Sequence, residues 1–350
     1  MRIHSRLILA ALASLPAVTF AATPTITSVN GTVQAGQTLT VVGTNLNNEA
    51  KANWDSFFVT NPNAWSFEGA SPAGDGFGAI GPKGGVYDST ASILGSKSMK
   101  FHVQGAATSL YNQLGNYNAI NPSGGDSNDL WIRAYVRWNN YNSGWPSSHI
   151  KMIDSQGSSL QYYFQPSPTS GSLPLTMSYK YDGASHSVNI PSGQVQNNRW
   201  YAVEIHWKTN ATPYVFDAWI DGVQVVDATP PGQGSLNYIL FGIINACCTN
   251  SSLSLDHWVD GLAVAKSRIY PSALVEVGNS SNYSTATKRT QELRKISDNQ
   301  VVLNLNLTNL GSGPYYLWVT NNGQVRSQAY ILGGGGGTTG LAAPKGLTVQ

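Results

Sequence analysis

The stretch from residue 199 to residue 227, which reads as two antiparallel strands and the start of a third, constrains the fold of this chain most strongly. Apolar and polar residues alternate along it with the period of a strand that has one buried face. The Asp221-Gly222 dipeptide is typical of a two-residue type I′ hairpin turn. The stretch therefore predicts an antiparallel sheet that packs on a second sheet. Its apolar positions are Val203, Ile205, Trp207, Phe216, Ala218, Ile220 and Val223.

The composition favours an extracellular all-β protein. Only 11% of the 350 residues are charged, while the chain has 36 glycines, 10 tryptophans and 17 tyrosines. No long window repeats with the helical period of 3.6 residues. Short apolar segments joined by Gly, Ser, Asn and Pro connections follow one another from residue 54 to residue 265. This pattern predicts a large jelly roll of two sheets.

Residues 1–21 have the features of a secretion signal. Arg2 and Arg6 precede an apolar run that is too short to span a bilayer, and Thr19-Phe20-Ala21 fits a cleavage site. We expect a secreted or cell-surface protein without membrane insertion. Removing these two arginines from the 20 Lys and Arg leaves 18, equal to the 18 Asp and Glu. This balance does not favour a nucleic-acid partner.

The two cysteines, Cys247 and Cys248, are adjacent. In an oxidising compartment they can close a vicinal disulfide, stay reduced, or bridge to another chain. The sequence alone leaves these three alternatives open.

Residues 333–350 begin with a run of five glycines, Gly333 to Gly337, which predicts a flexible linker. The last ten residues resemble the first strand of a fibronectin type III module. The chain is then either a fragment of a longer modular protein, with further modules as its partners, or it ends in the remnant of such a module.

Two segments far apart in the chain resemble an IPT/TIG domain, a small immunoglobulin-like sandwich. Its typical opening matches Pro24, Ile26, Val29, Gly36, Leu39, Val41, Gly43, Asn45 and Leu46. The remaining strands of the pattern match segments between Ala273 and Val325. The resemblance implies a discontinuous domain of residues 22–47 and 272–332, with residues 48–271 inserted at a surface loop.

The insert in turn resembles the concanavalin-like, laminin-G-like jelly roll, and within that fold it is most similar to the polysaccharide-lyase type. The resemblance rests on the Arg199-Trp-Tyr strand, the Trp219-Ile-Asp-Gly222 hairpin and a closing strand with Trp258-Val-Asp-Gly261. It implies a concave sheet with a groove for a glycan chain. The predicted fold class is thus all-β, a concanavalin-like jelly roll inserted in an immunoglobulin-like sandwich.

Aromatic and hydrogen-bonding residues share strand faces in the insert, as a sugar groove requires. On the alternative interpretation they are ordinary surface residues. The candidate substrate-binding residues are Arg133, Tyr135 and Arg137 on one strand, Gln161, Tyr163 and Gln165 on a second, and Tyr179 and Tyr181 on a third.

Catalysis by β-elimination on a uronate needs a base, an acid and a group that neutralises the carboxylate. His149, Lys151 and Tyr163 are the catalytic candidates, although none of them matches a specific lyase signature. The paired carboxylates of a retaining glycosidase are not evident in the sequence. No cofactor is predicted, apart from a structural calcium that Asp256 and Asp260 would bind.

Three functional hypotheses follow. The first is a secreted protein that binds an extracellular or cell-wall polysaccharide through the concave sheet. The second is a metal-independent lyase of uronate-containing glycans. The third is a structural or adhesive surface protein without a glycan site.

Overall fold

The structure is a computed structural model, and the residues it describes form β-strands and their connections. These residues are 22–47, 67–68, 70–72, 78–80, 85–104, 110–115, 129–140, 151–157, 161–166, 175–181, 184–189, 196–208, 212–229, 236–246, 254–265 and 268–333. The all-β prediction is confirmed for them. Within these ranges no helix is long and apolar enough to cross a membrane.

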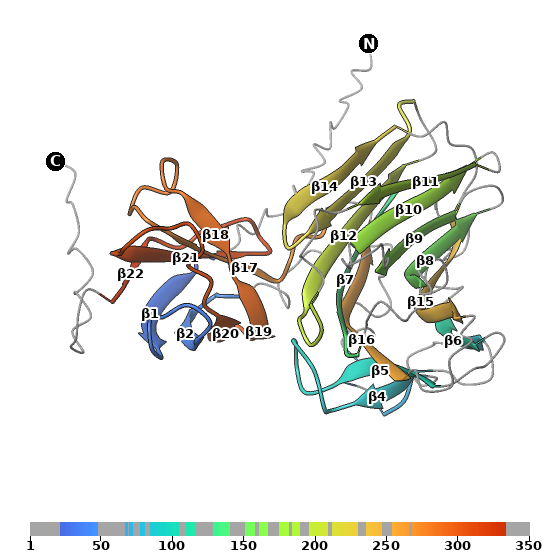
Figure 1. The fold of residues 1–350 in the computed structure, drawn as a ribbon, viewed down its shortest axis with the longest axis horizontal. Helices are drawn as coiled ribbons and strands as arrows, with labels where there is room; N and C mark the ends of the chain where they lie inside the picture. Colours follow the sequence, from blue (N-terminus) through green and yellow to red (C-terminus); the bar gives the residue numbers. More distant parts are fainter. Residues whose placement is uncertain are drawn as a thin grey trace, which may run out of the picture.

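Two large antiparallel sheets form a jelly roll, the large sandwich (Figure 1). Sheet I is seven-stranded in the described residues. Its strands in spatial order are β14 (Val223–Ala228), β13 (Val215–Ile220), β12 (Tyr201–Lys208), β7 (Asp129–Trp138), β16 (Ser254–Ala265), β5 (Ser98–Gln104) and β4 (Val86–Asp88).

Sheet II of the large sandwich also has seven strands in the part of the chain described. Their spatial order is β11 (Ala184–Asn189), β10 (Leu175–Tyr181), β9 (Gln161–Pro166), β8 (Lys151–Gly157), β15 (Leu236–Ala246), β6 (Leu110–Gly115) and β3 (Gly78–Ile80).

A second body, the small sandwich, contains the two ends of the described chain (Figure 1). One four-stranded sheet has the order β1 (Thr25–Asn30), β2 (Thr38–Thr44), β20 (Gln300–Asn304) and β19 (Glu292–Ile296). The other has the order β18 (Lys288–Thr290), β17 (Ala273–Gly278), β21 (Tyr315–Asn321) and β22 (Tyr330–Leu332).

Pairing of β2 with β20 closes the small sandwich across the chain. Leu39 lies opposite Leu303, and Val41 lies opposite Val301. These four side chains are fully buried and belong to one apolar cluster with Val275 and other residues of the facing sheet. Strands β3 to β16, and with them the large sandwich, lie in the chain between β2 and β17.

The segment from residue 199 to residue 227 folds as its pattern predicts. Strand β12 pairs with β13, and β13 pairs with β14 through the Asp221-Gly222 turn. Both turn residues have positive φ, 51° and 78°, as a type I′ turn requires. Trp207 is fully buried, and Trp219 is 7% exposed.

One side of sheet I packs against the small sandwich. Tyr135 of β7, Ala202 of β12 and Trp258 of β16 share an apolar cluster with the core of the small sandwich. Alternation places Ile132, Ala134 and Val136 on the opposite side of β7, toward sheet II. Strand β7 is therefore buried on both sides, which explains why its residues 132 to 136 are all buried.

Candidate functional site

Strands β8, β9 and β10 are hydrogen-bonded neighbours in sheet II. Tyr163 of β9 lies opposite Ser178 of β10 and Asp154 of β8. Gln161 lies opposite Lys180 and Gln156 in the same two strands. The register therefore brings predicted glycan-binding positions of β9 into a continuous band across three strands.

The backbone register divides these three strands into a mostly polar and a mostly apolar set of positions. Residues directly opposite each other in an antiparallel pair lie on the same side of the sheet. One side therefore holds the positions Asp154, Gln156, Gln161, Tyr163, Gln165, Thr176, Ser178 and Lys180. The alternate side holds Ile153, Phe164, Met177 and Val188, with Ser155, Tyr162, Tyr179 and His186 in the next row. We call the first set the polar face of sheet II.

The sequence-predicted candidates do not all fall on the polar face. Gln161, Tyr163 and Gln165 belong to it, whereas Tyr179 and Tyr181 occupy positions of the alternate side. The strand of Arg133, Tyr135 and Arg137 is β7, which lies in sheet I and not beside β9. This topology therefore does not place Arg133, Tyr163 and Tyr179 in a single groove.

Arg133 is fully buried in sheet I and its hydrogen bonds stay within the protein. Its Nε and Nη2 donate to the carbonyl of Gly261 at 3.1 and 2.8 Å. Its Nη1 donates to Ser272 Oγ at 2.9 Å. Tyr135, which is 1% exposed, accepts the backbone N–H of Ser272 at 2.8 Å. Both side chains join sheet I to the segment that enters the small sandwich, and neither presents a surface to a polysaccharide.

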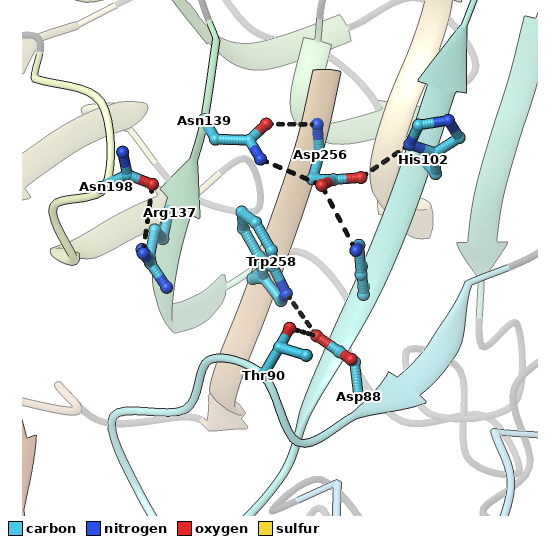
Figure 2. A network of polar contacts seen from close by, with 9 residues as sticks. Asp88, Thr90, His102, Arg137, Asn139, Asn198, Asp256 and Trp258 are labelled. Carbon is cyan, nitrogen blue, oxygen red and sulfur yellow. Dashed lines mark hydrogen bonds and ion pairs between the residues drawn. The ribbon is translucent and has the colours of Figure 1, made fainter. Parts of the chain in front are cut away.

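Arg137 is half-buried beside Trp258 (Figure 2). Its guanidinium carbon lies 5.0 Å from the centre of the indole, and Lys100 Nζ lies 5.2 Å from the same ring. Arg137 also donates to Asn198 Oδ1 at 3.1 Å. Trp258 in turn donates from Nε1 to Asp88 at 2.8 Å. Since Trp258 is only 4% exposed, the indole does not offer a stacking surface.

Asp256, a calcium candidate, is bound to protein partners (Figure 2). Its carboxylate lies 2.7 Å from His102 Nδ1 and 3.3 Å from Lys100 Nζ, and it accepts Asn139 Nδ2 at 3.0 Å. Burial acts to raise the pKa of Asp256, but hydrogen bonds from His102 and Asn139 and the charge of Lys100 outweigh it and lower the pKa. The carboxylate is thus held ionised by a surface network.

Asp260, the other calcium candidate, is fully buried. It accepts the backbone N–H groups of Ile93, Leu94 and Gly261 at 2.8, 3.0 and 2.7 Å. Burial raises the pKa of Asp260 to about 7, against the three hydrogen bonds, which lower it. In the described ranges no group of three or more His, Cys, Asp and Glu is placed to hold a metal ion.

Several predictions fall on residues outside the described ranges: the signal at 1–21, His149, Cys247, Cys248 and the tail from 334 to 350. Lys151 is the first residue of β8, where its backbone pairs with Ile244.

A charged cluster on sheet I was not predicted from the sequence. Glu204 is fully buried and accepts Arg268 Nε at 2.9 Å, while the guanidinium lies 4.0 Å from the centre of the Trp219 ring. Burial raises the pKa of Glu204, and Arg268 opposes the rise. His206 lies 3.0 Å from Asp129. Glu204 and His206 at alternate positions of β12 were the only sequence signal for this cluster.

Comparisons with known proteins give structural likeness alone. No family model matches the chain, and no curated protein matches it. Among solved structures, "Cellulose induced protein, Cip1" is similar with a TM-score of 0.43 and 16% identity over 59% of this chain and 98% of that one. Family 7 alginate lyase A1-II′ gives a TM-score of 0.39 and 16% identity over 56% and 89%.

The PL7 alginate lyase AlyA1 from Zobellia galactanivorans gives a TM-score of 0.35 and 11% identity over 53% and 81%. Values this low do not transfer a function. The function is therefore argued from the residues of the chain itself.

Proposed function

We propose that the protein binds a polysaccharide on the polar face of sheet II. The main support is the register of β8, β9 and β10. It places residues with amide, hydroxyl or charged side chains at the positions around Tyr163 on one side of the sheet. Amides and hydroxyls hydrogen-bond sugar hydroxyls, and a tyrosine ring packs on the C–H face of a sugar. Three adjacent strands, spaced about 4.8 Å apart, form a band wide enough for a polymer chain.

The position of the small sandwich supports this choice of face. The small sandwich covers one side of sheet I, where Tyr135, Ala202 and Trp258 are buried. The polar face belongs to the other sheet of the large sandwich (Figure 1). A polymer bound there would not compete with the contact between the two sandwiches.

The proposal is tested by affinity electrophoresis and calorimetry of the full chain with acidic and neutral polysaccharides. We expect retardation in at least one gel and a saturable heat of binding. If no acidic or neutral polysaccharide retards the protein, the proposal fails and the structural or adhesive hypothesis replaces it.

A second candidate function, a uronate lyase, uses the same face. Tyr163 would act as the base. Lys180 lies opposite Gln161, which is two residues before Tyr163 in β9, and would neutralise the uronate. Incubation with alginate or glucuronan tests this role. A rise in ultraviolet absorbance from an unsaturated product supports it, and binding without that rise leaves a binding protein.

We further propose that the chain is exported and that the small sandwich is an IPT/TIG-like support for the large one. The features of residues 1–21 support export. The pairing of β2 with β20, together with the motif residues Gly36, Leu39 and Val41, supports the family. Sequencing the amino terminus of the mature secreted protein tests the first part, with Ala22 expected as the first residue.

A further inference from the structure

The segment 91–97 lies between the two sandwiches and is hydrogen-bonded to both. Its backbone N–H groups face carboxylates. Asp260 of β16 accepts Ile93 and Leu94 at 2.8 and 3.0 Å. Glu68 accepts the N–H groups of Ser96 and Lys97 at 2.7 and 2.9 Å. These contacts fix the segment to the large sandwich.

The carbonyl and hydroxyl groups of the same segment bind β19 of the small sandwich. The N–H of Ile296 donates to the carbonyl of Ile93 at 2.9 Å. Lys295 Nζ donates to Ser92 Oγ at 2.8 Å and also to the carbonyl of Gly95. The side chains of Ile93 and Leu94 are buried in the apolar cluster that includes Ile296.

We propose that residues 91–97 act as a clasp between the two sandwiches, which Asp260 holds closed and whose opening loosens the small sandwich from sheet I. The N–H groups of residues 93, 94, 96 and 97 bind carboxylates of the inserted region, and the carbonyls of Ile93 and Gly95 accept from β19 of the small sandwich. The carbonyl of Ala91 accepts Ser98 Oγ of β5 and adds a bond to the large sandwich. Loss of the Asp260 bonds therefore releases Ile93, whose carbonyl holds Ile296.

The position of Asp260 makes the clasp sensitive to pH. In the closed clasp burial raises the pKa of Asp260 to about 7. In the open clasp water reaches the carboxyl group and its pKa returns toward the ordinary 3.8. The closed form therefore binds the proton more tightly. Its closure is favoured fully below pH 3.8 and weakens as the pH rises through about 7.

Other charged groups near Asp260 set the size of this effect. Lys295 of β19 lowers the pKa of Asp260 by its charge. Arg133 of β7 binds Gly261, the residue after Asp260, and Tyr135 lies opposite Asp260 in the sheet. Glu68, the second carboxylate on the clasp, has a lowered pKa: burial acts to raise it, and hydrogen bonds from Ser96 and Lys97 outweigh burial.

Amide hydrogen exchange of the full chain tests the clasp. The variants are Asp260→Ala, which removes both acceptor oxygens, and Lys295→Met, and the control is Asp227→Ala, which changes an exposed carboxylate on β14. We expect exchange of Ile93, Leu94 and Ile296 to become at least about tenfold faster in both variants and to stay unchanged in the control. Core amides of Val41 and Val301 report whether each variant is folded.

Two outcomes overturn the proposal. The first is that Ile296 exchanges at the wild-type rate in a folded Asp260→Ala protein. The second outcome concerns Lys295→Met, which keeps the buried carboxyl group and serves if the Asp260 variant does not fold. The proposal is overturned if the amides of Ile93 and Ile296 exchange at the wild-type rate in that protein. Exchange of the wild type from about pH 5 to about pH 8, corrected for intrinsic rates, tests the pH dependence. We expect Ile296 to lose protection as the pH rises from about 5 to about 7 and to change little above that, and a flat profile across the whole range overturns this part.

Discussion

The phenolic oxygen of Tyr135 accepts the backbone N–H of Ser272 at 2.8 Å, although 137 positions separate the two residues. Tyr135 lies in the centre of sheet I, and Ser272 immediately precedes β17 of the small sandwich. Both residues are buried. The contact thus couples the stability of the jelly roll to the placement of the small sandwich.

Replacing Tyr135 by Phe should lower the free energy of unfolding by about 1–2 kcal/mol, because the buried N–H of Ser272 loses its acceptor. Urea denaturation measures the change. The control is Tyr316→Phe on half-buried β21, for which we expect a change within about 0.5 kcal/mol. Equal effects of the two substitutions would contradict the prediction.

Replacing Arg133 by Met keeps the length of the side chain and removes its hydrogen bonds to Gly261 and Ser272. We expect a loss of about 3 kcal/mol in the free energy of unfolding, since buried acceptors lose a charged donor. Polysaccharide affinity should not change. If the variant keeps its free energy of unfolding but binds polysaccharide at least about tenfold more weakly, Arg133 is a binding residue and the prediction is wrong.

Replacing Arg268 by Met leaves the buried Glu204 without its cation. The raised pKa of Glu204 should rise further, because burial then acts unopposed by Arg268. A carboxyl group with a raised folded-state pKa loses stability as the pH rises, so the variant should be most destabilised, by about 3 kcal/mol, at neutral pH. Thermal unfolding at about pH 5 and about pH 8 measures this, and Glu204→Gln with Arg268→Met should remove the pH dependence.

Gly261 occupies a position that only glycine fits. Its φ is 52°, and a Cβ would lie 2.5 Å from Leu94 Cδ1 and 3.2 Å from Tyr135 Cδ2. Gly261→Ala should cost about 2 kcal/mol or more. The matched control is Gly311→Ala, which has a φ of 74° and nothing within 4 Å, and should show the backbone cost alone, about 1 kcal/mol. Chemical denaturation compares the two.

Tyr163→Ala should weaken polysaccharide binding about tenfold or more while leaving the fold intact, since position 163 lies on the polar face of sheet II. Tyr179→Ala is the matched control on the next strand. Position 179 lies on the alternate side, so its replacement should leave the affinity unchanged. Calorimetry and urea denaturation separate the outcomes, and weaker binding in Tyr179→Ala alone would contradict the assignment of faces.

Local patterns predicted the strands of this protein well. Alternation and the Asp221-Gly222 turn predicted β12, β13 and β14, because a strand with one buried face and a type I′ turn are both decided by neighbouring residues. The single strand predicted to hold Arg133, Tyr135 and Arg137 is β7. The first of the predicted short segments, at residue 54, lies outside the described residues.

Neighbouring residues could not predict which side of a sheet is exposed and which is covered by another part of the protein. Arg133 and Tyr135 alternate as exposed binding residues do, yet they are buried under the small sandwich. Tyr163 and Tyr179 look equivalent in sequence, but the register of β9 with β10 puts their positions on opposite sides. Alternation shows that two sides differ and does not show what covers either one.

By itself the sequence determined the all-β fold, most strand positions and the hairpin turn, since each depends on residues close together in the chain. The tertiary structure decided which strands share a sheet, which side of sheet I the small sandwich covers, and the burial of Asp260 beside Ile93. These depend on contacts between residues more than a hundred positions apart, such as the 167 positions between Ile93 and Asp260. Only packing of the complete chain sets such contacts.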